Sequence, residues 1–358
     1  MEEVKHIKSI NIQNFKCFDN FSAEGFGLYN IILGDNNVGK TSFLESLLFD
    51  RNINQTISYL QSILYYKRMG FNNEFEPNSI NPLTFFIRKG ANKDYLSINI
   101  SYFNDNAFKY TYATEKVENL TEEERKKFYD SINFGSNDKQ IVKVEIDNND
   151  FEFRSFNIDE NYESYDMMLP LVLPSIFYGK DLIQFYSENF TGSKSKKISL
   201  INQLKVIIFN IIDIELTYID GTPIIGIWLE NKDALLPLPM FGDGTIRLFR
   251  MIMEITMSKN KYLCIDEIDT GIHYSRYKDF SRIVLQTAKA NNVQLFISTH
   301  NNEFLKSFKE VLEEKEFAAY QDETKCFTLK KLPDESIKAY KYDFEEFEFA
   351  IEQENELR

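Results

Sequence analysis

The chain has 358 residues, of which 43% are hydrophobic and 15% aromatic, so it is long enough for one large domain or two smaller ones and too apolar for a disordered protein. Its net charge of −14 disfavours nonspecific DNA binding over the whole surface but leaves room for a local basic patch. The three cysteines lie far apart without a CxxC pair, which excludes a disulfide framework and a zinc site of that kind.

The N-terminal sequence MEEVKHIK lacks the apolar core of a signal peptide. The most apolar stretch, residues 198–216, contains several charged and amide side chains and is too polar to span a bilayer. Together with the unpaired cysteines, these features predict a cytoplasmic protein that does not contact a membrane.

The first elements of the chain are a strand and a short link. Residues 5–12 alternate between apolar and polar side chains, which predicts a β-strand. Residues 14–18 then form a polar-aromatic link in which Phe15 and Phe18 are expected in the core. We consider Lys16, between them, a candidate for lying near a nucleotide.

The next stretch has the spacing G-x-x-x-x-G-K-[ST] of a P-loop. A strand-type run at 31–33 precedes the turn, and a helical pattern follows it into the late 40s. The glycines let backbone N–H groups surround phosphate oxygens, the lysine reaches the β- and γ-phosphates, and the threonine hydroxyl can coordinate Mg²⁺. The alternative is a glycine turn that fits the pattern by accident. The predicted nucleotide-binding residues are Gly34, Asp35, Asn36, Asn37, Val38, Gly39, Lys40, Thr41 and Ser42.

The middle of the chain mixes strands and helices. Antiparallel strands are expected between 83 and 112 and again at 140–146 and 151–156, and residues 121–124 have the spacing of a capping box. Residues 160–215 look mostly helical, with 200–214 the clearest helix. Two basic segments, a cluster at 65–68 and a flexible loop expected at 192–197, are candidates for nucleic-acid contact, but each is more simply an ordinary solvated surface.

The last third alternates strands and helices. A proline-rich segment leads into Gly242-Asp243-Gly244 and an apolar-periodic helix. A buried strand then ends in Asp266-Glu267, a helix runs to about residue 290, and another buried strand ends before His300. Apolar strands separated by helices predict a parallel sheet that is covered on both faces.

An acidic strand end is the usual partner of a P-loop. Asp266 is expected to hold Mg²⁺, and Glu267 to orient and deprotonate the attacking water. His300 ends the neighbouring strand and can hydrogen-bond the γ-phosphate or the water, whereas His273 is expected to be a structural contact. The turn at 242–244 is either a loop whose glycines merely allow the turn, or a second anion-binding turn. In the second case a different subunit uses it, and ATP lies between two chains.

These motifs, I-x-I-x-N-F-K-x-F, GDNNVGKT, GDGTIRL, YLCIDEIDTGIHYS and LFISTHNNEFL, resemble those of ABC-type ATPases of the SMC/RecF/OLD branch. The chain looks closest to compact AAA-type ATP-binding proteins of bacterial anti-phage modules, such as the ATPase of PARIS-type systems. The resemblance covers roughly residues 5–50 and 235–310.

The resemblance assigns a role to each motif. It implies that residues 34–41 are Walker A, Asp266 and Glu267 are Walker B, His300 is the switch histidine, and Asp269 lies in the D-loop. Gly242, Asp243 and Gly244 would be the signature turn contributed in trans. One departure is Phe241, which stands where the family typically has a serine, and no Q-loop glutamine can be placed.

The implied fold is α/β: an ABC-type P-loop ATPase head with a mostly parallel core sheet, an antiparallel β lobe and a helical insertion. We expect an N-terminal ATPase lobe at 1–115, an insertion at 116–232 and a C-terminal ATPase lobe at 233–358. OLD nucleases carry a Toprim domain, but only about 50 residues follow the STH motif here, which is too few for one. Any nuclease should therefore be a separate protein.

The leading functional prediction is an Mg²⁺-dependent ATPase whose ATP-driven self-association controls a separate effector, a nuclease or toxin, in anti-phage defence. The alternatives are a RecF-like ATPase of DNA repair or remodelling, which the acidic composition disfavours, and a nucleotide-locked scaffold without turnover, which the intact Glu267 disfavours.

Overall fold

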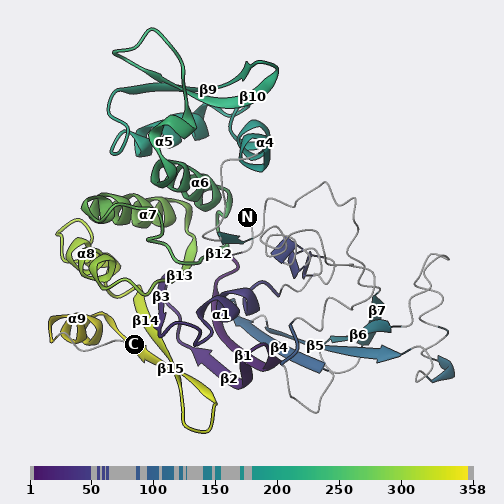
Figure 1. The fold of residues 1–358 in the computed structure, drawn as a ribbon. Coiled ribbons are helices and arrows are strands. Elements are labelled where there is room, and N and C mark those ends of the chain that lie inside the picture. The colour runs from purple at the N-terminus through teal and green to yellow at the C-terminus, as the bar shows by residue number, and fades with distance from the viewer. Residues whose placement is uncertain are drawn as a thin grey trace.

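The computed structural model contains three β-sheets flanked by helices (Figure 1). It describes residues 4–49, 55–56, 59–60, 62–63, 86–88, 95–104, 107–116, 121–123, 126, 140–146, 150–154, 170–172 and 180–353. Within these residues, two of the sheets have six strands each and the third has three.

The central sheet has the strand order β15-β14-β3-β13-β12-β8, and its neighbouring strands are parallel except for β14 and β15. The strands are β3 (Tyr29–Gly34), β8 (Leu171–Val172), β12 (Tyr262–Ile265), β13 (Gln294–Ser298), β14 (Thr324–Lys331) and β15 (Ile337–Tyr342). Every residue of β3, β12 and β13 is buried, as expected for apolar strands covered on both faces. The predicted mostly parallel core sheet is confirmed.

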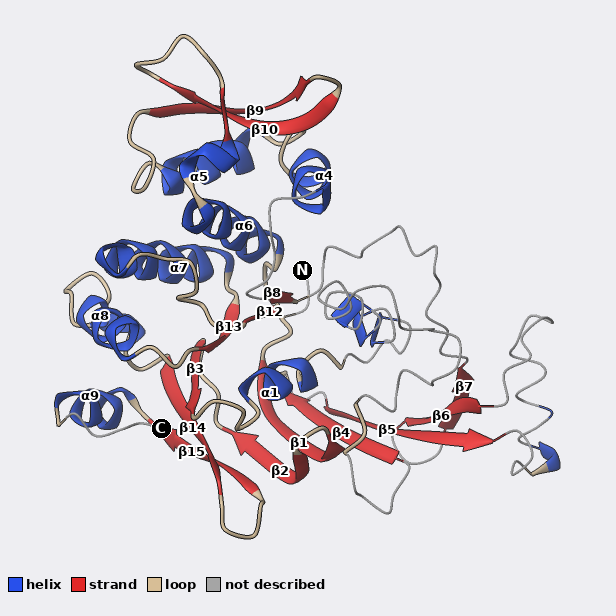
Figure 2. Ribbon diagram, in the orientation of Figure 1, coloured by secondary structure: helices blue, strands red, loops and turns tan. Residues whose placement is uncertain are grey.

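Helices cover the central sheet on both sides (Figure 2). One side carries α6 (Asp243–Met257), α7 (Tyr277–Asn291), α8 (Asn302–Leu312) and α9 (Phe344–Glu352). On the other side, α1 (Lys40–Ser46) lies between the central sheet and the N-terminal sheet. Two further helices, α4 (Lys180–Asn189) and α5 (Lys194–Leu204), lie beyond α6.

The N-terminal sheet is antiparallel throughout, in the order β2-β1-β4-β5-β6-β7. Its strands are β1 (Ile7–Phe15), β2 (Phe18–Glu24), β4 (Tyr95–Tyr102), β5 (Ala107–Lys116), β6 (Gln140–Ile146) and β7 (Asp150–Arg154). Its buried face packs on α1, where the Phe43 and Phe21 ring centroids are 5.7 Å apart. Phe15 and Phe18 are fully buried, as predicted. The antiparallel lobe therefore lies directly beside the P-loop.

The predicted helix at 200–214 is wrong in its second half. Helix α5 ends at Leu204, and residues 211–214 begin strand β9 (Ile211–Ile219), which pairs with β10 (Thr222–Leu229) and through it with β11 (Leu236–Pro237). The β-branched run of isoleucines favours a strand, and Asp220 and Gly221, both with positive φ, form the hairpin turn. The helix prediction is correct only for residues 200–204.

The basic segment 192–197 is also not a continuous loop. Ser193 is the N-cap of α5 and accepts a hydrogen bond from the backbone of Lys196, so the lysines belong to the first helical turn. The other basic segment, 65–68, lies outside the described residues, as do most of the strand expected at 83–88 and part of the helix expected at 121–124.

The division at 115 and 232 stays a prediction. Strand β8, from the middle segment, adds an edge to the central sheet beside β12, and β6 and β7 extend the N-terminal sheet. The middle segment thus contributes strands to both large sheets. None of the helices in the described part of the chain is long and apolar enough to cross a membrane.

A buried glutamate in α6 makes stability depend on pH. Glu254 is 4% exposed and lies 3.4 Å from the Nε atom of Arg250, measured from its Oε1 atom. Burial raises the pKa of Glu254 from 4.5 to about 7, against the opposing effect of Arg250. Between these two values the folded state holds a proton that the unfolded state has released, so the free energy of unfolding falls as pH rises through this window.

Replacing Glu254 with glutamine removes this titration. We expect the variant to gain stability relative to the wild type by about 3 kcal/mol between pH 4.5 and pH 8. Urea unfolding at several pH values measures the difference between the two proteins. A difference that is the same at pH 5 and pH 8 would contradict the assignment.

Candidate functional site

The P-loop connects β3 to α1 and depends on its two glycines. Gly34 and Gly39 have φ values of 135° and 112°, where side chains are strained. A Cβ atom on Gly34 would lie 2.5 Å from the carbonyl oxygen of Leu329, and one on Gly39 would lie 2.5 Å from the Sγ atom of Cys17. The tight wrap of the loop therefore requires glycine at both ends.

The side chain of Lys40 binds the backbone of its own loop. The Nζ atom of Lys40 donates hydrogen bonds to the carbonyl oxygens of Gly34, at 2.7 Å, and Asp35, at 2.9 Å. Lys40 is buried, whereas Asp35, Asn36 and Asn37 are exposed. The ammonium group is thus held at the mouth of the loop, where a phosphate can replace the carbonyl oxygens as its partner.

Strand β12 brings Asp266 against the start of α1. The Thr41 hydroxyl donates to Oδ2 of Asp266 at 2.8 Å, and the Ser298 hydroxyl donates to Oδ1 at 2.5 Å. Asp266 is 4% exposed, and its burial raises the pKa of its carboxyl. A hydroxyl and a carboxylate side by side are hard oxygen donors of the kind that Mg²⁺ prefers, so these two residues fit that ion.

Glu267 follows in a strained conformation. Its φ is 46°, and its backbone N–H donates to the Ser298 hydroxyl at 2.8 Å. Its carboxylate accepts a hydrogen bond from the Thr270 hydroxyl at 3.2 Å. Non-glycine residues in this region of φ are uncommon and often functional. Although Asp266 and Glu267 are adjacent in sequence, their carboxylates have different partners. Asp266 accepts from Thr41, and Glu267 accepts from Thr270.

The structure places Lys16 beside the loop. Its ammonium group pairs with the fully buried carboxylate of Glu45 in α1 and lies 4.9 Å from the centroid of the Phe86 ring. Lys16 lines a cavity of about 420 Å³ together with Asn37 and Val38 of the P-loop. Lys16 therefore lies beside the P-loop with a carboxylate partner, and its proximity to a nucleotide stays a prediction.

The predicted signature turn starts α6. A 3-10 helix, Leu238–Phe241, leads into Gly242, which has a φ of 84° and open space around its Cβ position. Gly242 and Asp243 are exposed, whereas a Cβ atom on Gly244 would lie 2.6 Å from the carbonyl oxygen of Gly271. One glycine is thus accessible to a ligand, and another packs against the loop that follows β12.

The two remaining predicted residues lie on neighbouring loops. Asp269 follows β12 and is 8% exposed, and His300 follows β13 and is exposed. The carboxylate of Asp269 contacts side chains on both sides of His300 in the sequence. His273 is exposed and interacts with the Ser275 hydroxyl, which agrees with a structural contact.

Comparison with known proteins gives the family. Residues 29–306 match the family described as “AAA domain, putative AbiEii toxin, Type IV TA system”. The chain belongs to this AAA-domain family. The matched range begins with β3 and ends within α8, so it contains the P-loop, the turn at 242–244, the acidic pair and His300. This AAA-domain protein is an ATP-hydrolysing enzyme.

A relative and a solved structure resemble the AAA-domain protein over almost its whole length. A protein of Helicobacter pylori (strain ATCC 700392 / 26695), named “ATP/GTP phosphatase”, is 24% identical over 394 residues, covering 98% of this chain and 99% of that protein. The crystal structure of the SmcHead bound to the C-winged helix domain of ScpA has a TM-score of 0.54 at 11% identity, covering 94% of this chain and 98% of that chain. The fold is that of an ABC-type, SMC-like ATPase head.

Arg247, which lies at the site of this AAA-domain protein, is absent from the sequence-based predictions. Arg247 of α6 donates from one guanidinium nitrogen to the carbonyl oxygens of Asp266, at 2.9 Å, and Glu267, at 2.6 Å. The helix that begins at the turn 242–244 therefore holds the backbone of the acidic pair. An arginine among the apolar residues of this helix was the available signal, because such a side chain is rarely buried without a partner.

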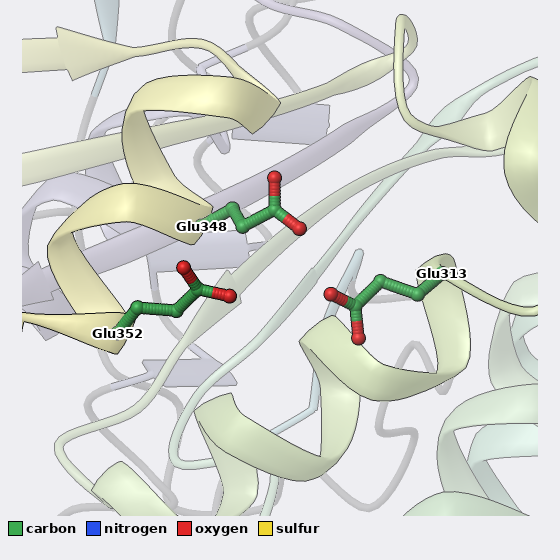
Figure 3. Close-up of side chains that lie close together, drawn as sticks. All are labelled: Glu313, Glu348 and Glu352. Carbon is green, nitrogen blue, oxygen red and sulfur yellow. The ribbon is translucent and has the colours of Figure 1, made fainter.

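A cluster of carboxylates outside the site has a structural role. Glu313, at the end of α8, and Glu348 and Glu352 of α9 face one another (Figure 3). The Nζ atom of Lys309 lies 2.7 Å from Glu313, 3.1 Å from Glu352 and 3.9 Å from Glu348. The lysine supplies the positive charge, so these residues form an ionic contact between the two helices rather than a metal site.

Proposed function

We propose that the AAA-domain protein binds ATP on the P-loop with Mg²⁺ held by Thr41 and Asp266. The supporting observation is the 2.8 Å contact between these two side chains, which joins the start of α1 to the end of β12. Bound there, Mg²⁺ would neutralise charge on the β- and γ-phosphates. The name of the Helicobacter pylori relative, a phosphatase of ATP and GTP, agrees with this nucleotide class.

Each side chain then has a separate task. Lys40 and the loop N–H groups from Asp35 to Ser42 bind the phosphates, and Lys16 lies at the edge of the same site. Glu267 accepts a proton from the attacking water, which its position one residue beyond Asp266 allows. His300 donates a hydrogen bond to the γ-phosphate and orients it.

We further propose that the turn Gly242-Asp243-Gly244 binds the ATP of a second subunit. Gly242 and Asp243 are exposed, and the P-loop of the same chain already supplies one phosphate cradle. Backbone N–H groups at the start of the 15-residue helix α6 favour an anion. ATP would then lie between two chains, and binding would favour the closed dimer while hydrolysis would release it.

Replacing Gly242 with glutamate tests this interface. A carboxylate at the turn would repel phosphate, so ATP-dependent association should be lost while each subunit still binds ATP. Light scattering after gel filtration, with and without Mg-ATP, measures the association. A variant that still associates would contradict the interface.

The matched control is Gly221→Glu in the β9–β10 turn. Gly221 also has positive φ, at 76°, and open space around its Cβ position, so backbone strain and added charge are the same. This control should associate like the wild type. If both variants lose association, the effect comes from strain or net charge and not from the turn at 242.

The cellular role that we propose is control of a separate effector, a nuclease or a toxin, in anti-phage defence. The family description, which names a toxin of a toxin–antitoxin system, supports a role of this kind. The solved SMC head, which is bound to the C-winged helix domain of ScpA, supports the proposal that a protein of this fold carries a partner. Co-purification with the product of a neighbouring gene tests the proposal together with phage plating on a deletion strain. No binding and unchanged plating would contradict it.

A further inference from the structure

Both oxygens of the Asp269 carboxylate are held by the residues on either side of His300. The Thr299 hydroxyl donates to Oδ1 at 2.6 Å, and the Asn301 side-chain amide donates to Oδ2 at 3.0 Å. Hydrogen bonds to a buried carboxylate are stronger than those between neutral groups. These two hydrogen bonds therefore connect the loop after β12 to the loop after β13, on both sides of His300.

The Asn301 side chain makes three further hydrogen bonds, with Glu303, Phe304 and Tyr277. Its oxygen accepts hydrogen bonds from the N–H groups of Glu303, at 3.0 Å, and Phe304, at 3.1 Å, which caps α8. Its nitrogen also contacts the hydroxyl of Tyr277, at the start of α7, at 2.8 Å. Only the nitrogen can donate to a carboxylate, so these contacts fix the orientation of the amide.

Ser298 joins the same two loops on the metal side. Its hydroxyl donates a hydrogen bond to Asp266 and accepts one from the backbone N–H of Glu267. Three of the four consecutive residues from 298 to 301 thus contact the loop that carries Asp266, Glu267 and Asp269. The fourth residue, His300, lies between Thr299 and Asn301, and both of these contact Asp269.

We propose that Asn301 and Thr299 are positioning residues for hydrolysis. By holding Asp269, they fix the backbone of His300 relative to Glu267 at the time of reaction. Both oxygens of Asp269 accept hydrogen bonds within its own chain. We call the contacts of Asp269 with Thr299 and Asn301 the bridge, and in this role Asp269 does not contact nucleotide. The inference rests on the proposed function of His300 and Glu267. It predicts that breaking the bridge slows turnover without weakening ATP binding, because the P-loop is not part of it.

The substitution Asn301→Asp isolates the bridge. Aspartate is as good an N-cap as asparagine, so α8 should keep its start. Its carboxylate, however, cannot donate to Asp269 and repels it. We expect kcat to fall by about tenfold or more, with KM for Mg-ATP within about threefold of the wild type.

Thr299 provides a second test that does not depend on the fold of the first variant. Thr299→Val removes the hydroxyl at nearly constant volume and should lower kcat in the same way, whereas Thr299→Ser keeps the donor and should restore it. The control Asn302→Asp adds the same charge one residue away, on an exposed side chain, and should behave like the wild type.

The wild type and Glu267→Gln are measured in the same assay, so that failure of the proposed function can be recognised. Wild-type turnover no higher than that of Glu267→Gln would overturn the proposed function and this role with it. With turnover present, the inference is overturned if Asn301→Asp and Thr299→Val stay within about twofold of the wild-type kcat, or if KM alone changes. It is equally overturned if Thr299→Ser is as slow as Thr299→Val.

Discussion

Replacing Glu267 with glutamine is expected to lower the rate of ATP hydrolysis by about 100- to 10,000-fold, the range typical for loss of a general base. The exchange keeps the size of the side chain and an oxygen that can accept the Thr270 hydroxyl, which lies 3.2 Å from the carboxylate. The strained backbone at Glu267 and its bond to Ser298 should persist. The binding of Mg-ATP should therefore be retained.

Phosphate release at saturating Mg-ATP measures the rate, and a fluorescent nucleotide measures binding. Glu310→Gln, which changes an exposed surface carboxylate that pairs with Lys278, is the matched control and should keep wild-type turnover. Turnover of Glu267→Gln within about threefold of the wild type would remove Glu267 from the reaction. Negligible turnover by the wild type itself would favour a nucleotide-locked scaffold.

Replacing Lys40 with methionine is expected to weaken binding of Mg-ATP by about 100-fold or more. The ammonium group is held at the mouth of the P-loop by the carbonyl oxygens of Gly34 and Asp35, so it is in place before nucleotide arrives. Methionine has a similar length but no charge and no donor. The loss is therefore that of two or more charge-assisted hydrogen bonds to phosphate.

Titration calorimetry with Mg-ATP measures this loss. Lys205→Met, at the exposed end of α5, removes the same charge away from the site and should bind like the wild type. A Lys40→Met variant that is folded, as judged by its melting temperature, and binds ATP within about threefold of the wild type would contradict the placement of nucleotide on this loop.

The sequence predicted the parts of the fold that have strong local signals. The P-loop spacing located β3 and α1 correctly, because two glycines and a lysine at this spacing between a strand and a helix are typical of a phosphate-binding turn. Mostly apolar runs located β12 and β13 in the core of a parallel sheet. In both cases residue type and pattern pointed to the same structure.

The hairpin of β9 and β10 was missed because two patterns compete there. The isoleucine-rich segment 206–214 fits a buried helix as well as a strand by periodicity alone. The dipeptide Asp220-Gly221, a strong hairpin signal, could have decided between them. Strand β14, which pairs with β3 in the core, was likewise not predicted.

The contacts around the candidate site could not be predicted from the sequence. Arg247 and Asn301 both act through contacts with residues 19 to 32 positions away in the chain, and no local pattern records such pairs. The sequence indicated that Asp269 and His300 belong to the site. It did not show that the Asp269 carboxylate accepts hydrogen bonds from Thr299 and Asn301, the residues on either side of His300.

We propose above all that ATP joins two copies of the chain between the P-loop and the turn at Gly242. The most direct measurement is the solution mass of Glu267→Gln by light scattering after gel filtration, with and without Mg-ATP, because this variant should bind ATP without consuming it. A monomer that becomes a dimer on addition of Mg-ATP is the predicted result. A mass that does not change with nucleotide would contradict the claim.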